Sequence, residues 1–191
     1  MKTETINNIL EVGTNLILKK GFNNVGIQEI LKEAKIPKGS FYYYFESKED
    51  FGIRLIKYYS QNSIGILNSY LQNKSKLPKE RILFFFRDMK NVYAEKQFTE
   101  GCLLGNCSLE LSDISESFSS VISSELDEWQ MCFERCVLEG QKTGNIKTER
   151  PAKEVANFLL TSWEGALLRM KSSKSGESIE VFINFIDAYI L

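Results

Sequence analysis

The chain contains 191 residues with a formal net charge of -1, and 43% of them are hydrophobic, which suits one folded domain or two small ones. Overall neutrality excludes a uniformly basic nucleic-acid coat protein, although it says nothing about local charge. The absence of histidine excludes a Ser-His-Asp triad, a Cys-His nucleophile pair, HExxH zinc chemistry and the Glu-x-x-His di-iron motif.

Apolar residues recur at helical spacing along almost the whole chain, which predicts an all-α protein. The first set of regularly spaced apolar residues, over 6–17, predicts a helix that should end at Gly21, because a left-handed residue is favoured just after a helix C-terminus. A short second helix over residues 27–34 should stop before Pro37. A third helix of about two turns should contain residues 41–45.

The stripes that follow predict a larger helical body. Ser47 should cap a helix that runs through Leu71, and Pro78 should open the next one. The remaining stripes cover residues 118–140, 151–170 and 179–190, with a short helical or irregular piece over 101–111. We therefore expect about nine helices, divided into a three-helix head, residues 1–48, and a body, residues 49–191.

The head has the ingredients of a helix-turn-helix, which are two short helices joined by a tight break, here Lys35-Ile36-Pro37. Residues 1–48 hold seven lysines and five glutamates, a net charge of +2, which leaves -3 for the body. The three consecutive tyrosines at 42–44 cannot all be buried, because successive helical residues point about 100° apart. An exposed phenol can bind phosphate. The alternative is a tightly packed aromatic hairpin without a DNA partner.

Several short sequence motifs in the head resemble those of a known family. Gly21-Phe22, Ile27-Gln28-Glu29-Ile30, Ala34, Pro37-Lys38-Gly39-Ser40-Phe41-Tyr42-Tyr43-Tyr44-Phe45 and Ser47-Lys48-Glu49 resemble the DNA-binding head of TetR-family repressors. The resemblance implies an all-helical homodimer joined through its last two helices, a ligand-binding body, a double-stranded operator and a small-molecule effector. By motif position it implies base-edge or neighbouring backbone contacts from Lys38, Gly39, Ser40 and Tyr43, phosphate contacts from Tyr42, Tyr44 and Lys48, and a groove contact from Gln28.

The head departs from the family pattern at three points. Val25-Gly26 stands where two hydroxyl residues often open the second helix, so Gly26 should be a weaker cap. Lys35 replaces the usual turn glycine and should adopt a positive φ. The first arginine is Arg54, so base readout should depend on lysine, tyrosine and DNA shape instead of bidentate arginine–guanine contacts.

The four cysteines divide into two groups. Cys132 and Cys136 lie one turn apart on an apolar stripe, which favours inert core thiols over a metal site. Cys102 follows Gly101 at a break between helices. If a helix begins there, its N-terminus would lower the pKa of the thiol; the alternative is a small buried residue in a tight joint.

A second resemblance concerns this break. Pro37-Lys38-Gly39-Ser40-Phe41-Tyr42, Ser47-Lys48-Glu49-x-Phe51-Gly52 and Gly101-Cys102-Leu103 resemble the electrophile- and oxidant-sensing branch of the family that controls N-ethylmaleimide reductase. The resemblance implies that Cys102 is the sensor and that Lys171, in the penultimate helix, assists it. A noncovalent hydrophobic inducer with a structural Cys102 is the alternative.

The body also carries aromatic residues that suit either a core or a ligand pocket, namely Phe98, Trp129, Phe133 and Trp163. We expect no catalytic residue, no cofactor and no metal. The opening residues lack the pattern of a signal peptide and no apolar run is long enough to span a membrane, so we expect a cytoplasmic regulator. A thiol-dependent helical protein without a DNA role is a more distant alternative, because it would leave the head motifs unexplained.

Overall fold

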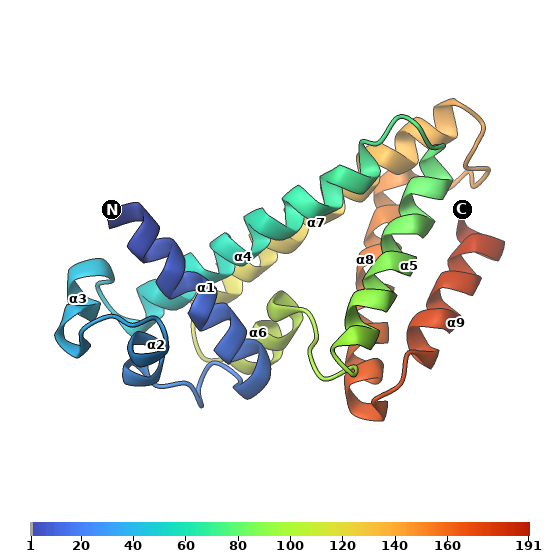
Figure 1. Cartoon of the computed structure of the whole chain (residues 1–191). Helices are drawn as coiled ribbons and strands as arrows, with labels where there is room; N and C mark the ends of the chain where they lie inside the picture. The colour runs from blue at the N-terminus through green and yellow to red at the C-terminus, as the bar shows by residue number, and fades with distance from the viewer. Residues whose placement is uncertain (1) are drawn as a thin grey trace. The chain divides into compact units, whose positions relative to one another are not determined.

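The computed structural model describes residues 2–191. Its regular secondary structure over these residues is helical with no strand, as the apolar periodicity predicts. The described part of the chain forms nine α-helices, which are labelled in Figure 1. Their bounds are α1 Lys2–Lys20, α2 Ile27–Glu33, α3 Phe41–Tyr44, α4 Lys48–Leu71, α5 Pro78–Glu95, α6 Leu103–Leu111, α7 Glu116–Lys142, α8 Ala152–Ser173 and α9 Glu177–Phe185. A 3₁₀ turn, Lys38–Ser40, leads into α3, and a π turn, Ile186–Ile190, continues α9.

The predicted helix boundaries are confirmed where a local signal fixes them. Gly21 has φ +83° and its N–H donates to the Ile17 carbonyl at 2.8 Å, so α1 ends in the left-handed residue that the sequence places there. At the start of α4, the Asp50 N–H donates to Ser47 Oγ at 3.0 Å. The Asp50 carboxylate in turn accepts the N–H of Glu46 at 3.0 Å. Local signals therefore set the C-terminal limit of α1 and the N-terminal limit of α4.

The chain packs as two compact units, the first made of the chain up to Asn62 together with Cys102–Glu125. The second contains Ser63–Gly101 and Leu126–Leu191. The first unit is therefore larger than the predicted head. Besides residues up to 48, it contains the start of α4, the whole of α6 and the start of α7. The functional division into a DNA-binding domain, 1–48, and a ligand-binding and dimerisation domain, 49–191, stays a prediction.

Aromatic rings fill the interior of the first unit. The rings of Phe41 and Phe45 lie 6.0 Å and 5.2 Å from that of Phe51, which fastens α3 to the first turn of α4. Phe22 and Phe118 meet edge to face at 5.3 Å. A Cβ at Gly52 would lie 2.7 Å from the Phe22 ring and 2.8 Å from the Phe118 ring, so only glycine fits between them.

The second unit is centred on Phe86 of α5. Its ring stacks on Phe133 of α7 at 5.4 Å and lies 4.9 Å from Trp163 of α8 and 4.8 Å from Phe182 of α9. Four helices thus meet around one side chain, and α5, α8 and α9 run beside one another (Figure 1). Such aromatic contacts add about 0.5–1.5 kcal/mol each beyond the area that they bury.

Candidate nucleic-acid interface

The turn between α2 and the next helix is the tight break that the sequence predicts. The Ile36 N–H donates to the Leu31 carbonyl at 2.8 Å, which closes the hairpin after Ala34. Lys35 has φ +58°, as expected from its place at the usual glycine of this turn. The left-handed conformation costs a residue with a side chain roughly 1 kcal/mol, which the hydrogen bonds and packing of the turn offset.

The segment from Lys38 to Tyr44, which we call the recognition segment, buries one aromatic side chain and exposes others. Phe41 is buried, whereas Tyr42 and Tyr43 are 73% and 67% exposed. The prediction that at least one of the three tyrosines is exposed is therefore confirmed, and Tyr44 is half-buried. Large aromatic side chains with most of their surface in water are unusual in a folded domain and mark a surface available to a partner.

The other predicted DNA-contacting residues lie at the start of this segment, on α2 and on α4. Lys38 and Gly39 are exposed, Ser40 is half-buried, and Gln28 is exposed on the first turn of α2. Gly26 caps α2 without a side-chain hydrogen bond, as expected. Lys48 Nζ lies 4.9 Å from the centre of the Phe22 ring, so its ammonium rests on an aromatic face in this structure. The individual DNA contacts of these residues stay predictions.

Sequence reasoning missed Lys2. Its Nζ lies 4.5 Å from the centre of the Tyr43 ring, which brings the start of α1 to the recognition segment. The Lys2 ammonium is attracted to the face of the Tyr43 ring and adds one positive charge to this surface. No local pattern near residue 2 signals this contact, because its partner is 41 positions away.

Cys102 is the N-cap of α6, so the helix does begin where the sequence suggested. The residue is only 3% exposed, which also agrees with the alternative of a small buried residue in a tight joint. Both hypotheses therefore remain open. Cys102 belongs to the first unit, and Lys171, half-buried near the end of α8, belongs to the second. Their pairing stays a prediction.

The other three cysteines are buried thiols. Burial raises the pKa of Cys107 to about 12, with a further contribution from the nearby Glu110 carboxylate. Burial also raises the pKa of Cys136 to about 11, although the Arg81 guanidinium opposes the change. Burial raises the pKa of Cys132 while Arg135 opposes it. Thiols of this kind carry little thiolate at neutral pH, and the burial of Cys132 and Cys136 agrees with their prediction as core thiols.

The four predicted pocket aromatics come from α7, α8 and the segment after α5. Phe133 and Trp163 both contact Phe86, whereas Trp129 is buried one turn earlier on α7. Phe98 follows α5 with φ +54°, and a Cβ at Gly176 would lie 3.1 Å from its ring. The first two therefore fill the interior of the second unit, and a ligand pocket built from all four stays a prediction.

A contact within the first unit links α6 to the loop after α1. The Glu110 carboxylate, two turns along α6 from Cys102, accepts the N–H of Phe22 at 2.9 Å and the N–H of Asn23 at 2.6 Å. We call this contact the Glu110 clamp. Nothing in the sequence signals it, because the partners are 88 and 87 residues apart. It gives α6 a direct connection to the helix-turn-helix.

Arg81 is the centre of a buried hydrogen-bond network in the second unit. Its side chain is 3% exposed, and it donates two hydrogen bonds to the Glu139 carboxylate, at 2.7 Å and 3.1 Å. It also donates to the Leu71 and Lys76 carbonyls, both at 2.8 Å. Hydrogen bonds from Arg81 and then Lys74 lower the pKa of Glu139 to about 2. This network closes the joint between α4 and α5 against α7.

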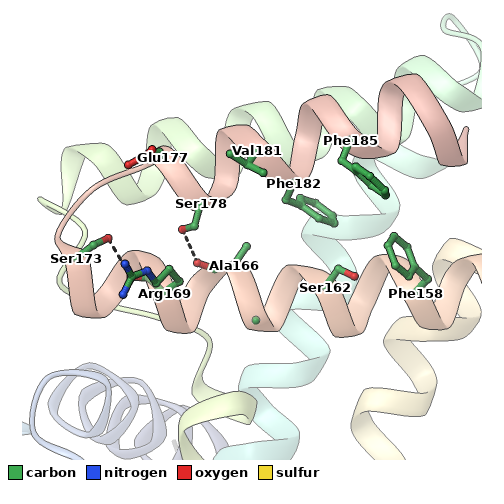
Figure 2. Close-up of a pocket in the computed structure, with 11 residues that line it drawn as sticks. Phe158, Ser162, Ala166, Arg169, Ser173, Glu177, Ser178, Val181, Phe182 and Phe185 are labelled. Carbon is green, nitrogen blue, oxygen red and sulfur yellow. Dashed lines mark hydrogen bonds between the residues drawn. The ribbon is translucent and has the colours of Figure 1, made fainter.

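Among the exposed apolar side chains of the second unit, Phe158 and Leu168 lie on α8 and Val181 and Phe185 lie on α9. A hollow of about 500 Å³ lies between α8 and α9. Figure 2 shows Phe158 at one end of it and Arg169 and Glu177 towards the other. Ser178 Oγ donates to the Ala166 carbonyl at 2.8 Å and joins the two helices within it. The Phe158 ring lies 6.4 Å from the ring of Phe185 on the other helix. This face is available for association.

A helix-turn-helix with an exposed aromatic recognition segment on an all-α scaffold defines a DNA-binding regulator. Residues 9–53 match the profile of bacterial regulatory proteins of the tetR family, and residues 78–186 match that of the tetracyclin repressor-like C-terminal domain. The chain therefore belongs to the TetR family of transcriptional regulators, and it is not an enzyme. Within the described residues, no helix is long and apolar enough to cross a membrane.

Individual relatives match along nearly the whole chain. The HTH-type transcriptional repressor DhaR of Mycobacterium sp. (strain GP1) is 33% identical over 185 residues, which make up 97% of this chain and 91% of that protein. A TetR regulatory protein from Rhodobacter sphaeroides superposes with a TM-score of 0.90 at 30% identity, covering 96% of this chain and 97% of that one. The reduced form of NemR from E. coli gives a TM-score of 0.87 at 30% identity, covering 96% and 95%.

Proposed function

We propose that this regulator is a homodimeric repressor that binds a palindromic operator and leaves it when a small reactive effector modifies Cys102. The observation that carries the DNA-binding part is the exposure of Tyr42 and Tyr43 on a recognition segment anchored by buried Phe41. One such segment per subunit reads each half-site, with the half-sites one helical turn or more apart. Because the head lacks arginine, lysine contacts with phosphates supply most of the affinity, and binding weakens steeply with salt.

The proposed dimer forms through α8 and α9. Its support is the apolar face described above, where Val181 is 63% exposed and Phe185 is 48% exposed, beside the hollow of Figure 2. Apolar side chains of this size on neighbouring helices are typical of a subunit interface. Placing a charge there with Val181→Asp should convert the dimer to a monomer in light scattering, with the helical content unchanged in circular dichroism. A variant that remains a dimer would move the interface elsewhere.

The proposed effector is an electrophile or an oxidant. The Cys102 thiol adds to an activated carbon–carbon double bond, so that a sulfur–carbon bond forms, the π bond breaks, and the thiol proton ends on the neighbouring carbon. With hypochlorous acid, the sulfur is oxidised to the sulfenic acid while chloride and a proton leave. In this proposal the Lys171 ammonium favours the thiolate.

The Glu110 clamp supports a route from this chemistry to the head. Cys102 caps α6 and Glu110 lies on the same helix, so an added group at the buried cap displaces the helix that carries the clamp. The loop held by the clamp follows α1 and precedes α2. Displacing it changes the support of the helix-turn-helix and lowers operator affinity.

The test is a gel shift with the purified protein and the palindrome upstream of its own gene, with and without N-ethylmaleimide. The wild type should bind and then release the DNA. Cys102→Ser should bind equally well and resist release, whereas Cys107→Ser, the matched control on the same helix, should behave as the wild type. Release of Cys102→Ser by the same reagent would refute cysteine sensing, and failure of every protein to bind DNA would refute the repressor itself.

A further inference from the structure

A second hollow in the second unit contains two cysteines. It measures about 350 Å³ and lies between the end of α4, the loop after it and α7. The lining residues that bear on its chemistry are Leu71, Lys74, Cys132, Arg135, Cys136 and Glu139. Neither cysteine takes part in the proposed DNA contacts or in the proposed sensing at Cys102.

The spacing of the two thiols restricts what they can form together. Cys132 and Cys136 are one helical turn apart on α7, so their Cβ atoms are separated by roughly 5–6 Å. A disulfide needs Cβ atoms about 3.5–4.5 Å apart, which an intact helix does not offer at this spacing. A single soft atom bonded to both sulfurs bridges the distance, because bonds between such an atom and sulfur are roughly 2.3 Å long.

The groups around the thiols argue against a hard or four-coordinate ion. Arg135 Nη2 donates to Cys132 Sγ at 3.2 Å, and Cys136 Sγ donates to the Pro78 carbonyl at 3.5 Å. The Glu139 carboxylate is held by Arg81 and Lys74. Over residues 2–191, no group of three or more His, Cys, Asp and Glu side chains is placed to hold a metal ion. The site therefore suits a centre that requires two sulfurs only.

We propose that Cys132 and Cys136 form a dithiol site that captures a monosubstituted trivalent arsenical. Two S–H bonds and two As–OH bonds break, two As–S bonds form, and two waters leave, with arsenic remaining trivalent throughout. The hollow has room for the organic substituent, because a cavity of about 150 Å³ already accommodates benzene. Leu71 gives it an apolar contact, and the exposed Lys74 and Arg135 lie at the rim.

Phenylarsine oxide is the probe, applied to the full-length reduced protein and followed by native mass spectrometry. We expect one aryl-arsenic group per chain that survives washing with a monothiol and is removed by 2,3-dimercaptopropanol. Cys132→Ser and Cys136→Ser should each weaken retention by about 10²-fold or more, because the second sulfur binds at high effective concentration. Cys107→Ser, which removes a buried thiol of α6, should retain the group as the wild type does.

A measurement on the wild type keeps the proposal testable if a serine variant misfolds. The arsenical-loaded protein is denatured in the presence of N-ethylmaleimide and then mapped by peptide mass spectrometry. Protection of Cys132 and Cys136, with Cys102 and Cys107 labelled, is the expected result. Labelling of either Cys132 or Cys136 in the loaded protein, or protection of the pair on α6, would overturn the assignment. Neither experiment depends on DNA binding.

Discussion

The Glu110 clamp can be tested by replacing one carboxylate oxygen with an amide nitrogen, as in Glu110→Gln. The carboxylate accepts two backbone N–H groups, from Phe22 and Asn23. The amide keeps one acceptor and turns a donor towards the other N–H. A hydrogen bond to a charged acceptor contributes about 1.5–3 kcal/mol. The substitution removes one such bond at a partly exposed site, so we expect the free energy of opening this loop to fall by about 1.5 kcal/mol.

The assay is amide hydrogen exchange, which reports the opening of the loop itself. A loss of about 1.4 kcal/mol corresponds to tenfold in the opening equilibrium, so the Phe22 and Asn23 amides should exchange about ten times faster in Glu110→Gln. Glu11→Gln, which removes an exposed carboxylate from the middle of α1, is the matched control and should leave both rates unchanged. Equal rates in the wild type and Glu110→Gln would refute the clamp.

Three further changes test other parts of the structure. Lys48→Ala, which removes a predicted phosphate contact, should weaken operator binding about equally for all sequences and reduce the slope of log affinity against log salt by about 1, measured by fluorescence anisotropy at several salt concentrations. Glu139 has its pKa lowered from 4.5 to about 2, so its pairing with Arg81 stabilises the fold fully above pH 4.5 and is lost as the pH falls through 2. Glu139→Gln should therefore lower the urea midpoint at pH 7, and its difference from the wild type should shrink over that acidic range; a difference independent of pH would contradict the pairing. Gly52→Ala should destabilise the protein by about 1–3 kcal/mol in urea denaturation, because its Cβ enters two aromatic rings, whereas Gly65→Ala on the same helix meets nothing within 4 Å and should be neutral or stabilising.

Local signals made much of the fold predictable. Gly21 and Ser47 mark helix ends through backbone conformation and capping, which depend on residues within one turn of each, and both positions are confirmed. The positive φ of Lys35 follows in the same way from its place in a short turn. Helical geometry alone predicts that at least one tyrosine of the recognition segment is exposed, and the structure exposes two.

Other features depend on contacts between distant segments and left no pattern in the sequence. The Glu110 clamp joins residues that only the packing of α6 against α1 brings together. The same packing places α6 and the start of α7 in the first unit, beyond the predicted boundary at residue 48. Cys132 and Cys136 were correctly expected to be buried, but an apolar stripe gives no indication that they line a hollow.

Lys35 has two opposing effects in the head: its backbone conformation lowers folding stability, and its charge attracts a polyanion. Glycine at this left-handed position would relieve roughly 1 kcal/mol of backbone strain. It would also remove one of only seven positive side chains in residues 1–48, where arginine is absent. The charge is exposed, and its field extends over a Debye length of about 10 Å at 0.1 M salt. Lys35 therefore lowers the stability of the turn slightly, and its positive charge increases the rate of association with DNA, most strongly at low ionic strength.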